Sequence, residues 1–209
     1  MNLVIAIDGP ASAGKGTLAR RLADALNLLH LDTGLLYRAT GRRVLDSGAS
    51  AADPLAAEAA ARALDEADLR RDDLRGPDAD AAASLVAKVP GVRSALLAFQ
   101  RNTASRGAVL DGRDIGTVVC PDAAVKLFVT ADVAARADRR WRELAGRGLD
   151  VPMEQVEAEI RARDTQDAGR DIAPLRQAPD AVLLDTTNLD ADAAFAQALE
   201  IVRNRTGPA

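Results

Sequence analysis

Short apolar runs alternate along this chain with longer segments in which apolar residues recur at the spacing of a helix. The runs have the length and composition of strands that are buried on both faces of a parallel sheet. They occupy residues 3–7, 28–31, 108–110, 126–129 and 181–184. Helical segments are predicted from Lys15, after Thr33, and over residues 50–68, 79–89, 91–105, 132–144, 153–168 and 191–202. This alternation predicts an α/β fold of three layers with a mainly parallel sheet.

Two breaks interrupt the pattern. Residues 70–80 are polar and contain the pair Gly76-Pro77, so we expect an exposed connection there. Gly146 and Gly148 follow an arginine-rich helix and flank a short segment, as the hinges of a mobile lid would. The sequence contains no internal repeat and no linker that would bound a second domain, so we interpret the chain as a single domain.

Composition and charge exclude several classes of protein. Apolar residues make up 48% of the 209 residues, which is enough for a sizeable core. A net charge of −4 and an aromatic content of 2% argue against binding to the phosphates or bases of nucleic acid. The single cysteine, Cys120, fits a reducing compartment. No apolar run approaches the ~18 residues of a membrane span, and the N-terminal run is too short for a signal peptide. We therefore expect a cytoplasmic protein that binds neither nucleic acid nor membranes.

The strongest motif is a glycine loop that directly follows the first predicted strand. Glycines let backbone N–H groups turn toward an anion, and the following helix presents its positive end to the same phosphates. Only three of the 27 cationic residues are lysines, and Lys15 is placed to reach the outer phosphates of a nucleotide. Gly16 stands where such loops usually have Ser or Thr, an ending that resembles nucleoside monophosphate kinases. The loop reads Gly9-Pro10-Ala11-Ser12-Ala13-Gly14-Lys15-Gly16-Thr17, with the Gly-x4-Gly-Lys spacing of phosphate-binding loops.

Other interpretations of this loop fit the sequence less well. A flexible turn would not need a buried-type strand before it and an amphipathic helix after it. Gly14, Gly16 and Ala19 match a dinucleotide fingerprint, with Asp32 at a plausible distance for a ribose hydroxyl. However, the first glycine of that fingerprint should follow the strand at once, whereas here the strand ends six residues before Gly14. A GTPase would need an Asn-Lys-x-Asp motif, which the sequence lacks.

A second polar cluster follows the third predicted strand. It reads Asp111-Gly112-Arg113-Asp114-Ile115-Gly116-Thr117. A carboxylate at the C-terminal end of a strand, beside a phosphate-binding loop, is where a Mg²⁺ shell is commonly held. Arg113 is placed to hold a phosphate in a bidentate manner. Alone, such a polar segment is more often a simple turn, but the glycine loop favours the functional interpretation.

Together with several shorter blocks, these motifs resemble one family, the bacterial cytidylate kinases. The blocks follow in order along nearly the whole chain: 5–17, 31–34 with Tyr37-Arg38, 111–119 with Pro121-Asp122-Ala123, 163–175, and Asp185-Thr186-Thr187. The resemblance implies a P-loop NTPase fold, with three α/β/α layers around a five-stranded parallel sheet. It implies one domain over residues 1–209, with a core at 1–32, 106–140 and 161–209, a monophosphate-binding region at 33–105 and a lid at 141–160.

The resemblance also implies a reaction and a set of site residues. The expected reaction transfers the γ-phosphoryl group of ATP to CMP or dCMP, giving ADP and CDP or dCDP, in pyrimidine nucleotide metabolism. Lys15, Arg113 and Arg170 match catalytic positions, and residues 9–17 match the ATP-binding loop. Mg²⁺ is the implied cofactor, with Thr17 and Asp111 as its side-chain ligands, directly or through water. We expect a monomer. The positions that match CMP-binding residues are Thr33, Arg38, Ser84, Arg93, Arg113, Asp114, Arg163, Asp167 and Arg170.

Some alternatives stay open at this point. Arg163, Asp167 and Arg170 are spaced four and three residues apart, so a helix would place all three on one face. On spacing alone, a row of solvent-exposed salt bridges is the simpler interpretation. Any of the arginines at 136, 139, 140, 142 and 147 could close on the ATP phosphates. We interpret Tyr37 and Trp141 as packing residues and His30 as a strand-end side chain without a catalytic role.

The segment between Leu64 and Ser84 departs from the family pattern, because it is short and lacks the small antiparallel sheet that the family usually carries there. The alternative enzyme is a UMP or AMP kinase on the same scaffold. A nucleotide-binding module without turnover is the alternative outside catalysis, and the presence of Lys15, Arg38 and Arg113 argues against it.

Overall fold

The structure is a computed structural model that describes residues 2–65 and 67–207. The chain divides into two compact units. The first unit comprises Met1–His30 and Ala104–Ala209, and the second comprises Leu31–Thr103. The expected monophosphate-binding region at 33–105 corresponds closely in extent to the second unit, and its role stays a prediction.

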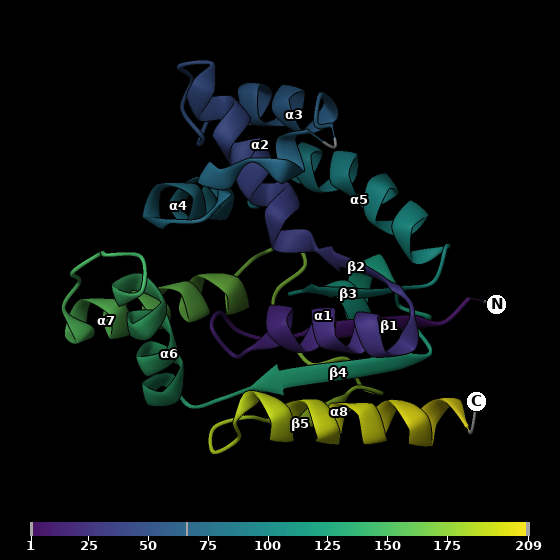
Figure 1. The fold of residues 1–209 in the computed structure, drawn as a ribbon. Coiled ribbons are helices and arrows are strands. Elements are labelled where there is room, and N and C mark those ends of the chain that lie inside the picture. The colour runs from purple at the N-terminus through teal and green to yellow at the C-terminus, as the bar shows by residue number, and fades with distance from the viewer. Residues whose placement is uncertain (1, 66, 208–209) are drawn as a thin grey trace. The chain divides into compact units, whose positions relative to one another are not determined.

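A five-stranded sheet in the order β2-β3-β1-β4-β5 organises the first unit (Figure 1). The central strand β1 pairs in parallel with β3 and β4, and β4 pairs in parallel with β5. The predicted strands are confirmed, with ends that differ by at most two residues. Their bounds are β1 Val4–Asp8, β2 Leu29–Asp32, β3 Ala108–Gly112, β4 Val125–Thr130 and β5 Val182–Asp185.

The register brings the carboxyl ends of the strands to one edge of the sheet. Asp8, the last residue of β1, lies opposite Gly112 in β3 and Phe128 in β4. In parallel strands the segments that leave this edge therefore start side by side. These segments are the glycine loop after β1, the polar cluster after β3 and the chain after β4, which enters helix α6 at Val133–Ala145.

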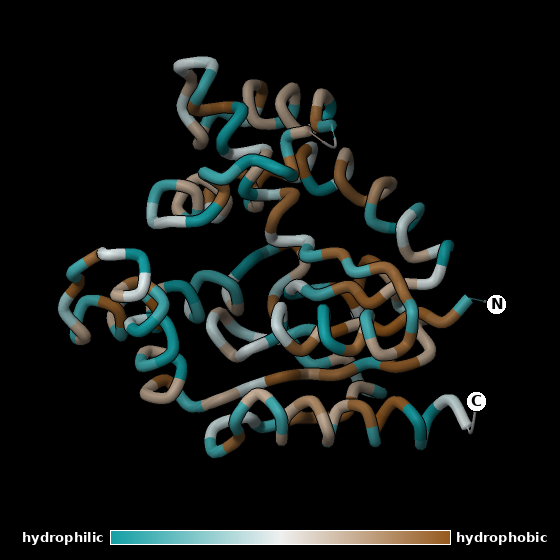
Figure 2. Tube along the Cα trace, in the orientation of Figure 1, coloured by the Kyte–Doolittle hydropathy of each residue, from teal (hydrophilic) through white to brown (hydrophobic). Residues whose placement is uncertain are grey.

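Two helices cover one face of this sheet and form the core of the first unit. Helix α1, Lys15–Leu26, and helix α8, Ala191–Thr206, pack on β1 and β4 through side chains such as Leu22, Ile7 and Val202. Figure 2 shows the corresponding hydrophobic colour along β1 and β4. The start of α1 at Lys15 confirms the helix that the apolar spacing predicts.

Helices α6 and α7 form a hairpin with a small apolar cluster of its own (Figure 1). Helix α6, Val133–Ala145, and helix α7, Met153–Ala168, pack through Ala137, Leu144 and Ile160. The Asp132 carboxylate caps α6 by accepting the Ala135 N–H at 2.6 Å. The predicted lid at 141–160 spans the end of α6, the turn and the first half of α7, and its movement stays a prediction.

Apart from Leu31 and Asp32, which belong to β2, the regular elements among the described residues of the second unit are helices and 3₁₀ turns. Arg43 pairs with the buried Asp68 at 2.7 Å. Leu74 is also fully buried, so the predicted exposed connection is wrong at this position. The elements are α2 Thr33–Asp46, α3 Pro54–Arg62, the 3₁₀ turns Asp68–Arg70 and Asp72–Leu74, α4 Pro77–Val86 and α5 Pro90–Ala104. The helix predicted over 50–68 is therefore shorter. The helix predicted after Thr33 begins at Thr33 itself, with Asp32 at the N-cap position.

No single helix in the described parts of the chain is long and apolar enough to cross a membrane. The pair α4 and α5, bent by 101°, passes this test together by length and composition only.

Candidate active site

The glycine loop has the backbone shape that an anion cradle requires. Ser12 and Gly14 have positive φ angles of 59° and 88°, which turn the chain sharply before α1. Gly9 approaches the neighbouring strand so closely that a Cβ there would lie 1.9 Å from the Val129 carbonyl oxygen. Glycine is thus required at position 9 by contact and at position 14 by conformation. The loop ends at the N-terminus of α1, where backbone N–H groups favour an anion.

Lys15 lies across the loop and is almost fully buried. Its ammonium group donates to the Pro10 carbonyl at 2.6 Å. Burial holds the pKa of Lys15 well below its ordinary value, and the positive charge of Arg113 lowers it further while Asp111 works in the opposite direction. A phosphate group beside this ammonium would favour its charged form, so anion binding and protonation of Lys15 should reinforce each other.

Asp111 brings a buried carboxylate to the same loop. Its Oδ1 lies 2.9 Å from His30 Nε2. A Cβ added at Gly16 would lie 3.8 Å from Asp111 Oδ2, so the second oxygen faces the start of α1. Thr17 is exposed in the first turn of this helix. The pair between His30 and Asp111 could not be predicted from the sequence, because the two residues are 81 positions apart.

Asp167 is the centre of a cationic cluster. It is 1% exposed, Arg113 Nε donates to its Oδ2 at 2.7 Å, and Arg170 donates to its Oδ1. Burial works to raise the pKa of Asp167, but Arg113, Arg170 and Arg163 together hold it below its ordinary value. The carboxylate is therefore ionised at neutral pH, with its orientation fixed from two sides.

The predicted single helix face for residues 163, 167 and 170 is wrong in one respect. Helix α7 ends at Ala168, so Arg170 lies two residues beyond its end and returns to Asp167 through the turn at Gly169. The Arg170 Nε atom is buried without a hydrogen-bond partner in the described chain. Because a buried unpaired donor is costly, this atom is well suited to bind an anionic ligand.

Four of the predicted CMP-binding residues belong to the second unit. Arg38 on α2 donates from Nε to Asp80 Oδ1 at 2.9 Å, and Ser84 on α4 donates to the Asp80 carbonyl at 2.9 Å. The guanidinium carbon of Arg93 on α5 lies 5.7 Å from the ring centre of Tyr37, close to the limit for a cation–π contact. Thr33 is buried at the start of α2. The second unit thus brings Arg38 and Ser84 together around Asp80, while Arg113, Asp114, Arg163, Asp167 and Arg170 belong to the first unit.

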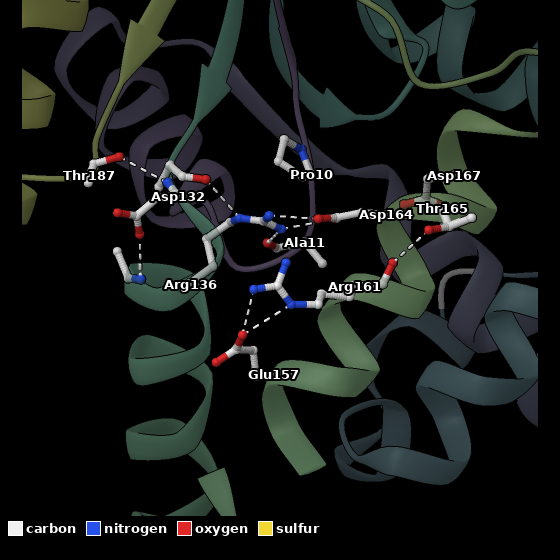
Figure 3. A network of polar contacts seen from close by, with 12 residues as sticks. Pro10, Ala11, Asp132, Arg136, Glu157, Arg161, Asp164, Thr165, Asp167 and Thr187 are labelled. Atoms are coloured by element: carbon white, nitrogen blue, oxygen red, sulfur yellow. Dashed lines mark hydrogen bonds and ion pairs between the residues drawn. The ribbon is translucent and has the colours of Figure 1, made fainter. Parts of the chain in front are cut away.

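Arg136 and Arg139 bind other parts of the protein itself. Figure 3 shows the contacts of Arg136. Arg136 is 4% exposed and makes a bidentate pair with Asp164 on α7 at 2.9 and 2.6 Å. It also donates to the carbonyls of Ala131, at 2.9 Å, and Ala11 in the glycine loop, at 3.3 Å. Arg139 donates to Thr186. Arg140, Arg142 and Arg147 also form ion pairs. Among these three and Arg136, the side chain of Arg142 is the most exposed.

Comparison with known proteins decides the family. A model of the cytidylate kinase family matches residues 5–204. A cytidylate kinase of Granulibacter bethesdensis is 62% identical over 206 residues, covering 98% of this chain and 99% of the relative. One from Acidiphilium cryptum is 59% identical, covering 96% and 95%. The chain belongs to the cytidylate kinase family.

The fold also occurs among solved structures. The structure of an uncharacterized protein from Eubacterium ventriosum superposes with a TM-score of 0.61 at 14% identity, covering 98% of this chain and 100% of the other. At that identity the likeness concerns the fold alone.

Two features of the site could not be predicted from the sequence. The bond network of Arg136 joins three segments, and nothing in the arginine-rich pattern separates this residue from its neighbours. Asp8 is a buried carboxylate at the end of β1, and it accepts two backbone N–H groups from the segment after Asp114. The signal that could have found Asp8 is a charged residue that ends an otherwise apolar run.

Proposed function

We propose that this protein transfers the γ-phosphoryl group of ATP to the 5′-phosphate of CMP or dCMP, releasing ADP and CDP or dCDP. Membership of the cytidylate kinase family supports this reaction. In the structure, one observation carries this proposal: Lys15 lies within the electrostatic influence of four charged residues of the same unit. They are Asp111, Arg113, Arg163 and Asp167. A donor-phosphate lysine and an acceptor-side arginine cluster share one electrostatic environment, as phosphoryl transfer requires.

On the donor side, residues 9–17 hold the ATP phosphates. Backbone N–H groups of the loop and the start of α1 bind phosphate oxygens, and Lys15 neutralises charge on the transferred group. Its bond to the Pro10 carbonyl holds the ammonium over the loop. Thr17 and Asp111 fit a Mg²⁺ ion, because a hydroxyl and a carboxylate oxygen near the loop are hard ligands of the kind that Mg²⁺ prefers. When bound, Mg²⁺ neutralises charge on the β- and γ-phosphates.

On the acceptor side, each assignment follows the family pattern and fits the local contacts. Arg38 and Arg113 hold the CMP phosphate, with Thr33 nearby. Ser84, Arg93 and Asp114 read the cytosine edge. Asp167 accepts hydrogen bonds from the sugar hydroxyls, and its ionised state, held by Arg113 and Arg170, makes it a strong acceptor. Arg163 and Arg170 complete the cationic cluster around the transferred phosphoryl group.

The chemistry needs no covalent enzyme intermediate and no general base. The attacking oxygen belongs to a phosphate that is already ionised at neutral pH. Catalysis therefore consists of positioning the two phosphates and neutralising charge with Lys15, Arg113 and Arg170. We further propose that the protein is a cytoplasmic monomer of pyrimidine nucleotide metabolism, that its ligands are ATP and CMP or dCMP, and that it binds neither nucleic acid nor membranes.

A coupled assay of ADP release tests this function. Initial rates are compared with CMP, dCMP, UMP and AMP as acceptors at equal concentration, with Mg²⁺ and ATP present. We expect the largest kcat/KM with CMP or dCMP. A larger value with UMP or AMP would support the alternative kinase. Saturable nucleotide binding without ADP release from any acceptor would show a binding module.

A further inference from the structure

Asp8 is a buried charge that the reaction as described does not use. Its side chain lies at the carboxyl end of the central strand, directly before the glycine loop, and the residue is 4% exposed. Oδ1 accepts the Ile115 N–H and Oδ2 accepts the Gly116 N–H, both at 2.7 Å. An ionised group at such a depth is costly unless it is hydrogen-bonded, and these two N–H groups supply the bonds that it needs.

The segment that Asp8 holds follows the Arg113-Asp114 pair without a break. Residues Ile115–Val119 form a π-helical turn, a conformation that is rare and occurs frequently at functional sites. The Asp114 carbonyl accepts the N–H groups of Val118 and Val119 at 2.9 and 3.1 Å. The first N–H groups of a helical turn lack partners within the turn. Here the Asp8 carboxylate supplies partners for two of them.

Packing beneath the turn leaves it little freedom. A Cβ at Gly116 would lie 3.3 Å from Asp8 Oδ2 and 3.1 Å from the Cδ of Lys126. The Lys126 ammonium is itself anchored to Asp180 at 2.8 Å. Gly116 thus lies between the Asp8 carboxylate and the Lys126 side chain, and a Cβ there would be in tight contact with both. These contacts restrict how the turn can shift.

The sheet holds Asp8 in place, but it does not hold the turn that Asp8 binds. The Asp8 backbone pairs with Gly112 on one side and Phe128 on the other, so the sheet fixes it independently of the carboxylate. Ile115 and Gly116 lie outside the sheet strands. Loss of the side-chain bonds should therefore release the turn with Asp114 and leave the glycine loop largely in place.

We propose that Asp8 is a positioning residue for the acceptor nucleotide: its carboxylate fixes the turn that carries Arg113 and Asp114, and so sets acceptor affinity while leaving ATP affinity nearly unchanged. This inference rests on the proposed function, in which Arg113 and Asp114 face CMP. Asp8 itself touches no substrate in this proposal.

The test uses Asp8→Asn, which keeps the shape but has a single acceptor oxygen, so one N–H of the turn loses its partner. A buried hydrogen bond lost in this way changes an equilibrium constant about tenfold. We expect the KM for CMP to rise about tenfold, the KM for ATP to change less than threefold, and the preference for CMP over UMP to fall. Amide hydrogen exchange of Ile115 and Gly116 should become faster.

Asp190→Asn is the matched control. Asp190 also accepts two successive backbone N–H groups, from Asp192 and Ala193 at 3.0 and 2.8 Å, but it caps α8 on the surface. This variant should leave both KM values unchanged. If Asp8→Asn does not fold, Gly116→Ala is used instead, because its methyl group would press on Asp8 Oδ2 and Lys126 and displace the same turn. It should likewise raise the KM for CMP and leave the KM for ATP nearly unchanged.

Three outcomes would overturn the proposal: an unchanged KM for CMP in folded Asp8→Asn, equal increases for CMP and ATP, or equal effects of Asp8→Asn and Asp190→Asn. Failure of the proposed function is seen separately, in the parent protein, as a preference for another acceptor. The Asp8 comparison is then made with that acceptor, and a rise in its KM without a rise for ATP still supports the positioning role.

Discussion

The ion pair between Arg136 and Asp164 joins α6 to α7 and can be measured with a double-mutant cycle (Figure 3). The perturbations are Arg136→Met, Asp164→Asn and the two combined. The Arg136 side chain is 5% exposed and that of Asp164 is 28% exposed. Removing one partner of a buried pair typically costs about 3–5 kcal/mol, whereas an exposed pair contributes about 0–1 kcal/mol. The partial exposure of Asp164 places this pair between the two cases.

The contacts set the size of each effect. Arg136→Met removes two bonds to Asp164 and two to the carbonyls of Ala131 and Ala11. We expect it to lower the free energy of unfolding by about 3 kcal/mol. Asp164→Asn leaves one oxygen as acceptor and water can reach the site, so we expect about 2 kcal/mol. The double variant should cost little more than Arg136→Met alone, which gives a coupling energy of about 1–2 kcal/mol.

Urea unfolding followed by circular dichroism measures these differences, and thermal midpoints check them at about 2–4 °C per kcal/mol. Arg142→Met is the control, because Arg142 pairs with Asp138 at 3.0 Å on the same helix with 72% of its side chain exposed. It should cost less than about 0.5 kcal/mol. If the single effects add to within about 0.5 kcal/mol in the double variant, the pair is not coupled and this account of the network is refuted.

Further predictions concern the charges of the site. Lys15→Ala should lower turnover about 10²–10³-fold with folding intact, and single-turnover rates within tenfold of the parent would remove Lys15 from the phosphate site. Asp167→Ala should raise the KM for CMP but have little effect on dideoxy-CMP, which offers no sugar hydroxyl. If the parent and the variant discriminate between CMP and dideoxy-CMP by the same factor, Asp167 and its arginines have a structural role and do not bind the sugar. Burial raises the pKa of Asp8 from 3.8 to about 6, so its contribution to stability is complete below pH 3.8 and is lost as pH rises through about 6. Relative to Asp8→Asn, the parent should lose about 2 kcal/mol between pH 4 and pH 7 in urea titrations, and a constant difference would contradict this pKa.

Local patterns were sufficient to predict the strands and the glycine loop. The strand ahead of Gly9 is an uninterrupted apolar run, and burial on both faces is the physical reason for such a run. The loop spacing is equally local, since it depends on glycines that a close contact with Val129 and a positive φ at Gly14 require. These features need no information from distant parts of the chain.

Helix ends in the polar regions were predicted less well. The alanine-rich segment at 50–68 has high helix propensity throughout, but the helix covers only Pro54–Arg62, and the buried Asp68 takes part in an ion pair with Arg43. Arg170 shows the same limit, because its spacing from Asp167 fits a helix that has already ended at Ala168. Propensity is a weak guide wherever a tertiary contact can replace a helical hydrogen bond.

Three of the contacts that could not be predicted join segments that leave different strands at the same edge of the sheet. Asp8 holds the turn at Ile115, Arg136 reaches the Ala11 carbonyl, and the Thr186 hydroxyl reaches the Ala13 carbonyl at 3.2 Å. In each case a side chain of one segment binds backbone atoms of another, so the partner's residue type leaves no mark on the sequence. The candidate site is therefore held together by contacts between the ends of different strands, and Asp8→Asn should act through only one of them, the contact between β1 and the Ile115–Val119 turn. The bonds from Arg136 and Thr186 to the glycine loop do not involve Asp8, so the loop should keep its shape in this variant.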